Sequence, residues 1–156
     1  MIHILIIRFS TFLLKLCFYI LEEIKQNNSN VDVAFTVDAT GSMGDYIAAV
    51  KDSIDHIVSR ISQKYKNATV RLAFVGYRDY DVPETHFEIL DFTESIPEFS
   101  EFVGKIKEKD GGDVPEDVLG GIDKTIHLNW KAANRIFYQI GEILFGYICS
   151  SRYRIT

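Results

Sequence analysis

The residues best suited to chemistry lie in one short stretch, Asp38-Ala39-Thr40-Gly41-Ser42, directly after an apolar run. Asp38, Thr40 and Ser42 occupy alternate positions, so their side chains can point the same way in an extended loop. A carboxylate and two hydroxyls are hard oxygen ligands, which suit Mg²⁺, Mn²⁺ or Ca²⁺ and not zinc. Gly41 lets the backbone fold closely around an ion. The stretch predicts a divalent-cation site, although a Ser42 that merely caps a following helix fits the same pattern.

Apolar patterns on either side of this stretch predict the elements that position it. Strands are predicted over residues 31–37, 69–77, 86–91 and 134–140, and helices over 47–65, 95–108 and 115 to about 127. Strands that alternate with helices indicate an α/β fold whose sheet carries helices on both faces. The connection between the second and third strands is too short for a helical crossover, so these two strands should pair antiparallel.

The predicted topology also indicates where a ligand binds. In open α/β sheets a ligand sits beyond the carboxyl ends of the strands, where the strand order reverses. The loops after the first and fourth predicted strands, together with the helix-opening loop at Gly111 to Pro115, should therefore meet at one edge. A charged turn with Arg78, Asp79 and Asp81 follows the second strand at or near this edge. It is interpreted either as a salt-bridged turn or as a contact with a partner at the rim.

The N-terminal segment, Met1 to Ile24, is almost wholly apolar. Arg8, Lys15 and Glu22 recur every seven residues, which on a helix gives a narrow polar stripe. Three interpretations stay open: a packing helix that covers a core face, a membrane or secretory signal, or a wrongly assigned gene start. Residues 26–30 form a polar linker, so the predicted organisation is an N-terminal segment with linker (1–30), a domain (31–142) and a tail (143–156).

Length, charge and cysteine content narrow the class of protein. A chain of 156 residues predicts one main domain. The formal charge of −5, without a cluster of Lys and Arg, argues against nucleic-acid binding. The two cysteines, Cys17 and Cys149, lie far apart and predict neither a disulfide framework nor a zinc site. A clear signal peptide is not discernible, which favours the cytoplasm over a membrane-associated or secreted location.

Catalytic motifs are not discernible in the chain. It lacks the pattern G-x-x-x-x-G-K-[ST], with which a glycine-rich loop and a lysine cradle phosphates. A nucleophile paired with a base is not discernible either. We therefore expect a binding protein and not an enzyme.

Three motifs in order resemble one known family. They are VDVAFTVDATGSM at residues 31–43, GYRDY at 76–80 and GGDVPEDV at 111–118. Together they are similar to von Willebrand factor A domains, of the subgroup associated with alpha-type protein kinases. The resemblance covers roughly Val31 to Gly141 and implies a Rossmann-like sheet. It also implies a metal-ion-dependent adhesion site that binds a protein partner, where an acidic side chain of the partner completes the coordination of Mg²⁺, or of Mn²⁺ or Ca²⁺.

The resemblance implies a role for five residues. Asp38, Thr40 and Ser42 match the first metal-binding motif, with Thr40 in place of a serine. Asp113 falls where many members of the family have a metal-ligating threonine. Glu142 stands where an aspartate usually follows the fourth strand, although its side chain is longer and the residues after it do not match. Solvated loop acids remain the alternative for Asp113 and Glu142.

The sequence departs from the family after Glu142. The family adds two further strands with their helices, whereas residues 143–156 do not match. The fourth predicted strand would then be an exposed apolar edge, which invites aggregation or pairing with another chain. We therefore expect a truncated domain of marginal stability. The alternative to a metal-dependent module is accordingly a truncated fragment of a larger protein that no longer binds.

Overall fold

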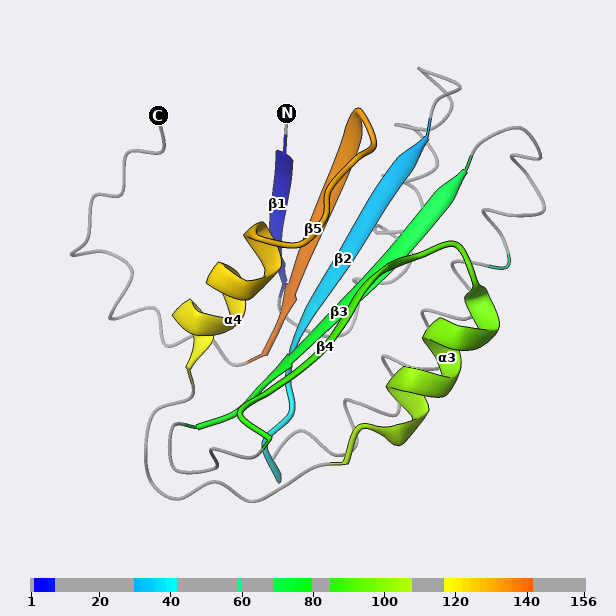
Figure 1. The fold of residues 1–156 in the computed structure, drawn as a ribbon. Coiled ribbons are helices and arrows are strands. Elements are labelled where there is room, and N and C mark those ends of the chain that lie inside the picture. The colour runs from blue at the N-terminus through cyan, green and yellow to red at the C-terminus, as the bar shows by residue number, and fades with distance from the viewer. Residues whose placement is uncertain are drawn as a thin grey trace, which may run out of the picture.

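The fold is known from a computed structural model, which describes residues 2–7, 30–41, 59, 69–79, 85–107 and 117–141. Among these residues, five strands form one sheet in the order β1-β5-β2-β3-β4, and two helices, α3 and α4, pack against it (Figure 1). The strands are β1 (Ile2–Ile7), β2 (Val31–Asp38), β3 (Val70–Tyr77), β4 (Phe87–Thr93) and β5 (Asn134–Ile140). The helices are α3 (Ile96–Lys105) and α4 (Val118–Ile126).

The centre of the sheet is parallel and fully covered. β2 pairs in parallel with β3 on one side and with β5 on the other. All eight residues of β2 are buried, as expected for a strand with elements on both faces. Its β-branched and aromatic side chains suit such a strand, and the predicted strand is confirmed.

β3 and β4 form the predicted antiparallel pair. Tyr77 lies opposite Phe87, and Phe74 lies opposite Leu90. The register shifts between Leu72 and Phe74, so the ladder is irregular near the end of β4. β4 is last in the strand order and is therefore an edge strand, and its side chains are less buried than those of β2.

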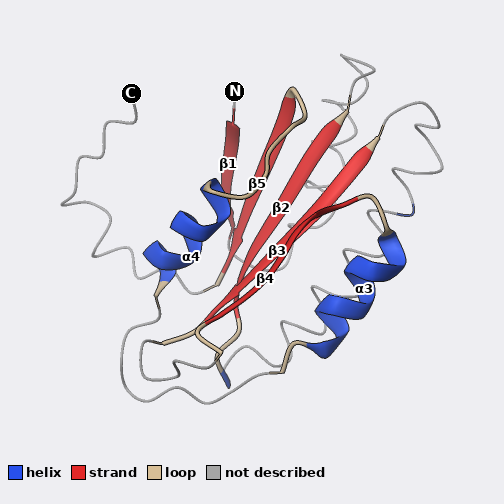
Figure 2. Cartoon of the chain, in the orientation of Figure 1, coloured by secondary structure: helices blue, strands red, loops and turns tan. Residues whose placement is uncertain are grey.

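The two helices cover opposite faces of the sheet. α3, capped by the Ser95 side chain, packs Phe99 against Phe35 of β2 and Phe74 of β3. α4 lies on the other face, where Thr125 forms a hydrogen bond with Thr36, the residue next to Phe35. Figure 2 shows both helices against the twisted sheet. The predicted α/β class with helices on both faces is confirmed, whereas most of the predicted helix over 47–65 lies outside the described residues.

The N-terminal segment differs from the helical interpretation. Ile2–Ile7 is a strand, β1, whose six residues pair in parallel with β5. The helical prediction is wrong for these residues because the run IHILII is rich in β-branched side chains and β5 offers it a partner. The prediction that the fourth strand is an exposed edge is also wrong, since β5 lies between β1 and β2. Residues 8–29 lie outside the described part.

In the described part of the chain, none of the helices combines the length and the apolar character that a membrane crossing requires.

Candidate functional site

The candidate site lies at the edge of the sheet where the parallel strands end. Asp38 is the last residue of β2, and its side chain is buried, with 1% exposed. Gly141, directly after β5, lies beside it: a Cβ added at Gly141 would stand 2.9 Å from the Asp38 Cβ and 3.6 Å from its Oδ2. The loops that follow β2 and β5 therefore start side by side, as the topology predicted.

Asp38 and Thr40 are held together by two hydrogen bonds. Asp38 Oδ1 accepts from the Thr40 backbone N–H at 2.9 Å and from the Thr40 hydroxyl at 2.7 Å. Both residues are buried, with 5% of Thr40 exposed. A hydroxyl that gives its proton to a carboxylate keeps lone pairs that can face a cation. The pair thus supplies two hard oxygen donors in a fixed arrangement, which fits Mg²⁺, Mn²⁺ or Ca²⁺.

The other predicted ligands are not placed by the structure. Ser42, Asp113 and Glu142 lie outside the described residues. In the part that is described, side chains of His, Cys, Asp and Glu do not form a group of three or more that could hold a metal ion. The structure thus brings together Asp38 and Thr40 of the five predicted ligands.

The end of the GGDVPEDV motif returns to the same edge. Asp117 caps α4, since its Oδ1 accepts from the Gly120 N–H at 2.8 Å. The Asp117 backbone N–H donates to the carbonyl of Arg78, just after β3, at 3.3 Å. His86 Nε2 lies 3.1 Å from Asp117 Oδ2. The start of α4 is thereby fixed next to the end of β3 and the start of β4.

A buried tyrosine, Tyr77, lies next to Asp38 on the neighbouring strand. Tyr77 lies opposite Asp38 in the β2–β3 register, and its hydroxyl accepts from Gln139 Nε2 of β5 at 2.8 Å. A Cβ at Gly121 would come within 2.7 Å of the Tyr77 ring, and one at Gly141 within 2.6 Å of its hydroxyl. Glycine at both positions lets α4 and the residue after β5 approach Tyr77 this closely.

Arg78 is the residue whose role the sequence did not reveal. Its Nη2 lies 2.5 Å from Glu88 Oε2, so the arginine forms an ion pair with a residue of β4 and not with the acidic residues of the turn, and it is buried and not at a rim. Asp79 is also buried, and Asp81 lies outside the described residues. An arginine directly after a buried strand is a sequence signal for such a role. A cation that is buried there requires several hydrogen-bond acceptors around it.

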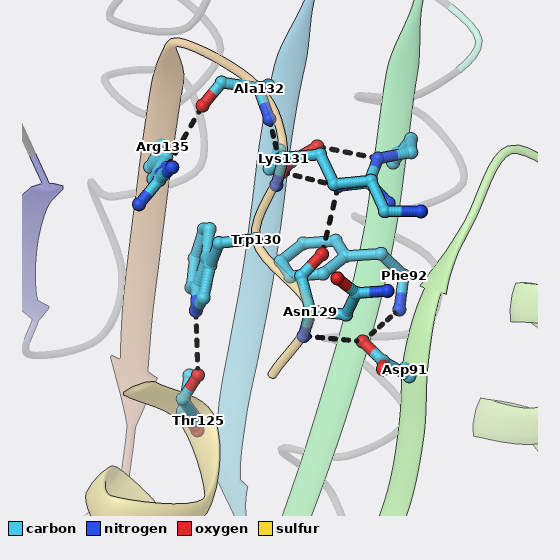
Figure 3. A network of polar contacts seen from close by, with 10 residues as sticks. Asp91, Phe92, Thr125, Asn129, Trp130, Lys131, Ala132 and Arg135 are labelled. Atoms are coloured by element: carbon cyan, nitrogen blue, oxygen red, sulfur yellow. Dashed lines mark hydrogen bonds and ion pairs between the residues drawn. The ribbon is translucent and has the colours of Figure 1, made fainter. Parts of the chain in front are cut away.

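A second polar network lies at the opposite end of the sheet (Figure 3). Asp32, fully buried in β2, accepts from Arg71 Nε at 2.8 Å and Arg71 Nη2 at 2.6 Å. Its Oδ2 also accepts from the backbone N–H groups of Lys131 and Ala132 at 2.7 and 2.8 Å. Asp32 therefore ties the loop between α4 and β5 to the start of the sheet, beside a cleft of about 650 Å³.

Comparison with known proteins identifies the family. Residues 32–138 match the sequence profile of the von Willebrand factor A domain, which is more than half of the chain. The chain belongs to the von Willebrand factor A domain family, and the resemblance drawn from the three motifs is confirmed.

Two relatives and one solved structure are among the proteins that are similar to the chain. An alpha-protein kinase, vwkA, of Dictyostelium discoideum is 36% identical over 72% of this chain and 18% of its own length. A putative ariadne-like RING finger protein of Acanthamoeba polyphaga mimivirus is 31% identical over 58% of this chain and 9% of its own. The chain thus spans less than a fifth of each relative. The pilus adhesin SpaC of Lactobacillus rhamnosus GG is 18% identical, with a TM-score of 0.43 over 55% of this chain and 11% of its own.

Proposed function

We propose that this chain is a divalent-metal-dependent protein-binding module. The observation that carries the proposal is the Asp38–Thr40 pair, buried at the carboxyl edge of the sheet with its oxygens fixed by two hydrogen bonds. Membership of the von Willebrand factor A family supports it. The motif that begins at Asp38 resembles the first metal-binding motif of that family in order, with Thr40 in place of a serine.

In this proposal a hard cation, Mg²⁺ or else Mn²⁺ or Ca²⁺, is held by Asp38, Thr40 and Ser42, with Asp113 and Glu142 as further ligands. Mg²⁺ prefers six oxygen ligands and keeps several waters, so the protein need not fill every position. An acidic side chain of a protein partner takes one of the remaining positions. Metal and partner binding are then coupled, and a chelator releases the partner.

Catalysis is not part of the proposed function. The similarity to the alpha-protein kinase covers 18% of that protein, and this chain lacks a phosphate-cradling loop with a lysine. The proposed role is to bind a partner.

Isothermal titration with Mn²⁺ tests the proposal. We expect saturable heat with the wild-type chain and its loss in Asp38→Ala. The matched control is Asp123→Ala, which removes an exposed aspartate from α4 and should leave the titration unchanged. Circular dichroism verifies that each variant is folded. A wild-type chain without saturable heat, or an Asp38→Ala variant that titrates like the wild type, would overturn the proposal.

A further inference from the structure

Arg78 contacts the ends of the segments that meet at the candidate site. Its side chain is 1% exposed, so it is a buried cation at the carboxyl end of β3. Nε donates to the carbonyl of Ala39 at 3.1 Å, Nη1 to the carbonyl of Thr85 at 2.5 Å, and Nη2 to the carbonyl of Lys107 at 2.6 Å. Nη2 also donates to Glu88 Oε2 at 2.5 Å. One planar group thus joins three segments of the chain: the residues after β2, the start of β4 with the residue Thr85 just before it, and Lys107 just after α3.

The backbone of Arg78 adds two further connections. Its N–H donates to the His86 carbonyl at 3.0 Å, and its carbonyl accepts from the Asp117 N–H at 3.3 Å. Lys107 and Asp117 flank residues 108–116, which include the predicted ligand Asp113. Arg78 therefore binds the chain on both sides of that loop.

The same side chain fixes the first metal-binding motif. Ala39, whose carbonyl accepts from Arg78 Nε, stands between the two residues of the candidate site, Asp38 and Thr40. A hydrogen bond to Ala39 limits rotation of the peptide that connects them. The ion pair with Glu88 neutralises the guanidinium, so this buried cation adds little repulsion toward a metal ion nearby.

We propose that Arg78 is a positioning residue for metal binding, one that holds the Asp38–Thr40 loop in a fixed relation to Lys107 and Asp117. The inference rests on the proposed function for the identity of the ligand. A guanidinium suits this role because it presents five N–H donors in one rigid plane. An ammonium has three donors on a flexible stem and cannot reach the same acceptors together.

The test compares Arg78→Lys with Arg71→Lys in the full chain. Both changes replace an arginine that is paired with a carboxylate, and Arg71 lies at the opposite end of the sheet. We expect Arg78→Lys to weaken Mn²⁺ binding by about tenfold or more, the usual effect of losing a group that orients metal ligands. Arg71→Lys should change the affinity by less than about twofold, since it orients no ligand of the site. Equal affinity of Arg78→Lys and the wild type would overturn the inference, as would equal losses in both variants.

Hydrogen exchange of the metal-free protein gives a second readout. We expect faster exchange in Arg78→Lys at the amide of Thr40, which donates to Asp38 Oδ1, and at the amide of Asp117. Unchanged exchange at both amides would refute a positioning role. If Arg78→Lys does not fold, Glu88→Ala replaces it, because Glu88 lies on an edge strand with a side chain 30% exposed. Glu88→Ala removes one acceptor of the guanidinium, so it should weaken Mn²⁺ binding and speed hydrogen exchange at the Thr40 amide. Unchanged Mn²⁺ affinity together with unchanged exchange would contradict the inference.

The two measurements separate the inference from the proposed function. A wild-type chain that binds no Mn²⁺ refutes the metal site, and the exchange rates at Thr40 and Asp117 then decide whether Arg78 orders the chain around them. A wild type that binds Mn²⁺, together with an unaffected Arg78→Lys variant, keeps the proposed function and refutes the inference.

Discussion

Removal of either partner of the Asp32–Arg71 pair should destabilise the domain strongly. Arg71→Met removes two charge-assisted hydrogen bonds, each worth about 1.5–3 kcal/mol, and a contact of the guanidinium with the Phe92 ring. The Asp32 carboxylate keeps the N–H groups of Lys131 and Ala132, so it is not left without donors. We therefore expect a loss of about 3 kcal/mol in the free energy of unfolding, toward the lower end of the range for a broken buried pair.

Asp32→Ala should cost more than Arg71→Met. It leaves the Arg71 guanidinium without its carboxylate and removes the acceptor of both loop amides. We expect a loss of about 3–5 kcal/mol, a large fraction of the stability of a typical domain. In the double variant the guanidinium is gone as well, so the two losses should not add. The expected coupling energy is about 2–3 kcal/mol.

Urea denaturation of the wild type, the two single variants and the double variant measures this coupling. The midpoint of thermal unfolding should fall by about 6–12 °C in Arg71→Met, given the usual scaling for domains of this size. A coupling energy below about 0.5 kcal/mol would show that the two side chains act independently, and it would refute a stabilising ion pair between them.

Two further predictions concern α4 and α3. Gly121→Ala should destabilise the domain by about 1–3 kcal/mol in urea denaturation, because its Cβ would overlap the Tyr77 ring. Gly104→Ala, whose Cβ meets nothing within 4 Å, should instead stabilise the domain by up to about 1 kcal/mol. A change of the same sign in the free energy of unfolding of both variants would contradict the packing argument. The hydrogen bond and charge of Lys105 lower the pKa of the exposed Glu101 carboxyl, so NMR titration of Lys105→Met should show this pKa raised. The small stabilisation from this pair is present above pH 4.5 and is lost as the pH falls through the lowered pKa, and an unchanged pKa in the variant would refute the assignment.

Local pattern was sufficient for the central strands and for the start of the site. The buried run of β2 is apolar apart from Asp32, Thr36 and its last residue, Asp38. The short connection after β3 dictated the antiparallel pairing with β4. These features depend on neighbours in sequence, so they could be predicted from the sequence alone.

Long-range pairing was not accessible in the same way. The polar residues spaced seven apart in the N-terminal segment favoured a helix, whereas β1 forms because β5, far along the chain, offers its edge. The contacts of Arg78 were likewise hidden, since its acceptors come from three separate segments. Asp32 and Arg71 did carry a signal, because each occupies the second position of its strand segment and the strands pair in that register.

The position of β5 has a consequence for how the chain folds. Both of its neighbours, β1 and β2, come from the first part of the sequence, and the Ile2–Arg135 pair joins residues at nearly opposite ends of the described chain. During synthesis β1 cannot pair with β5 until residues 134–140 have emerged from the ribosome. Contacts of such long sequence separation close large loops and slow folding. Completion of the sheet is therefore a late event, and the apolar β1 segment depends on it for protection from other chains.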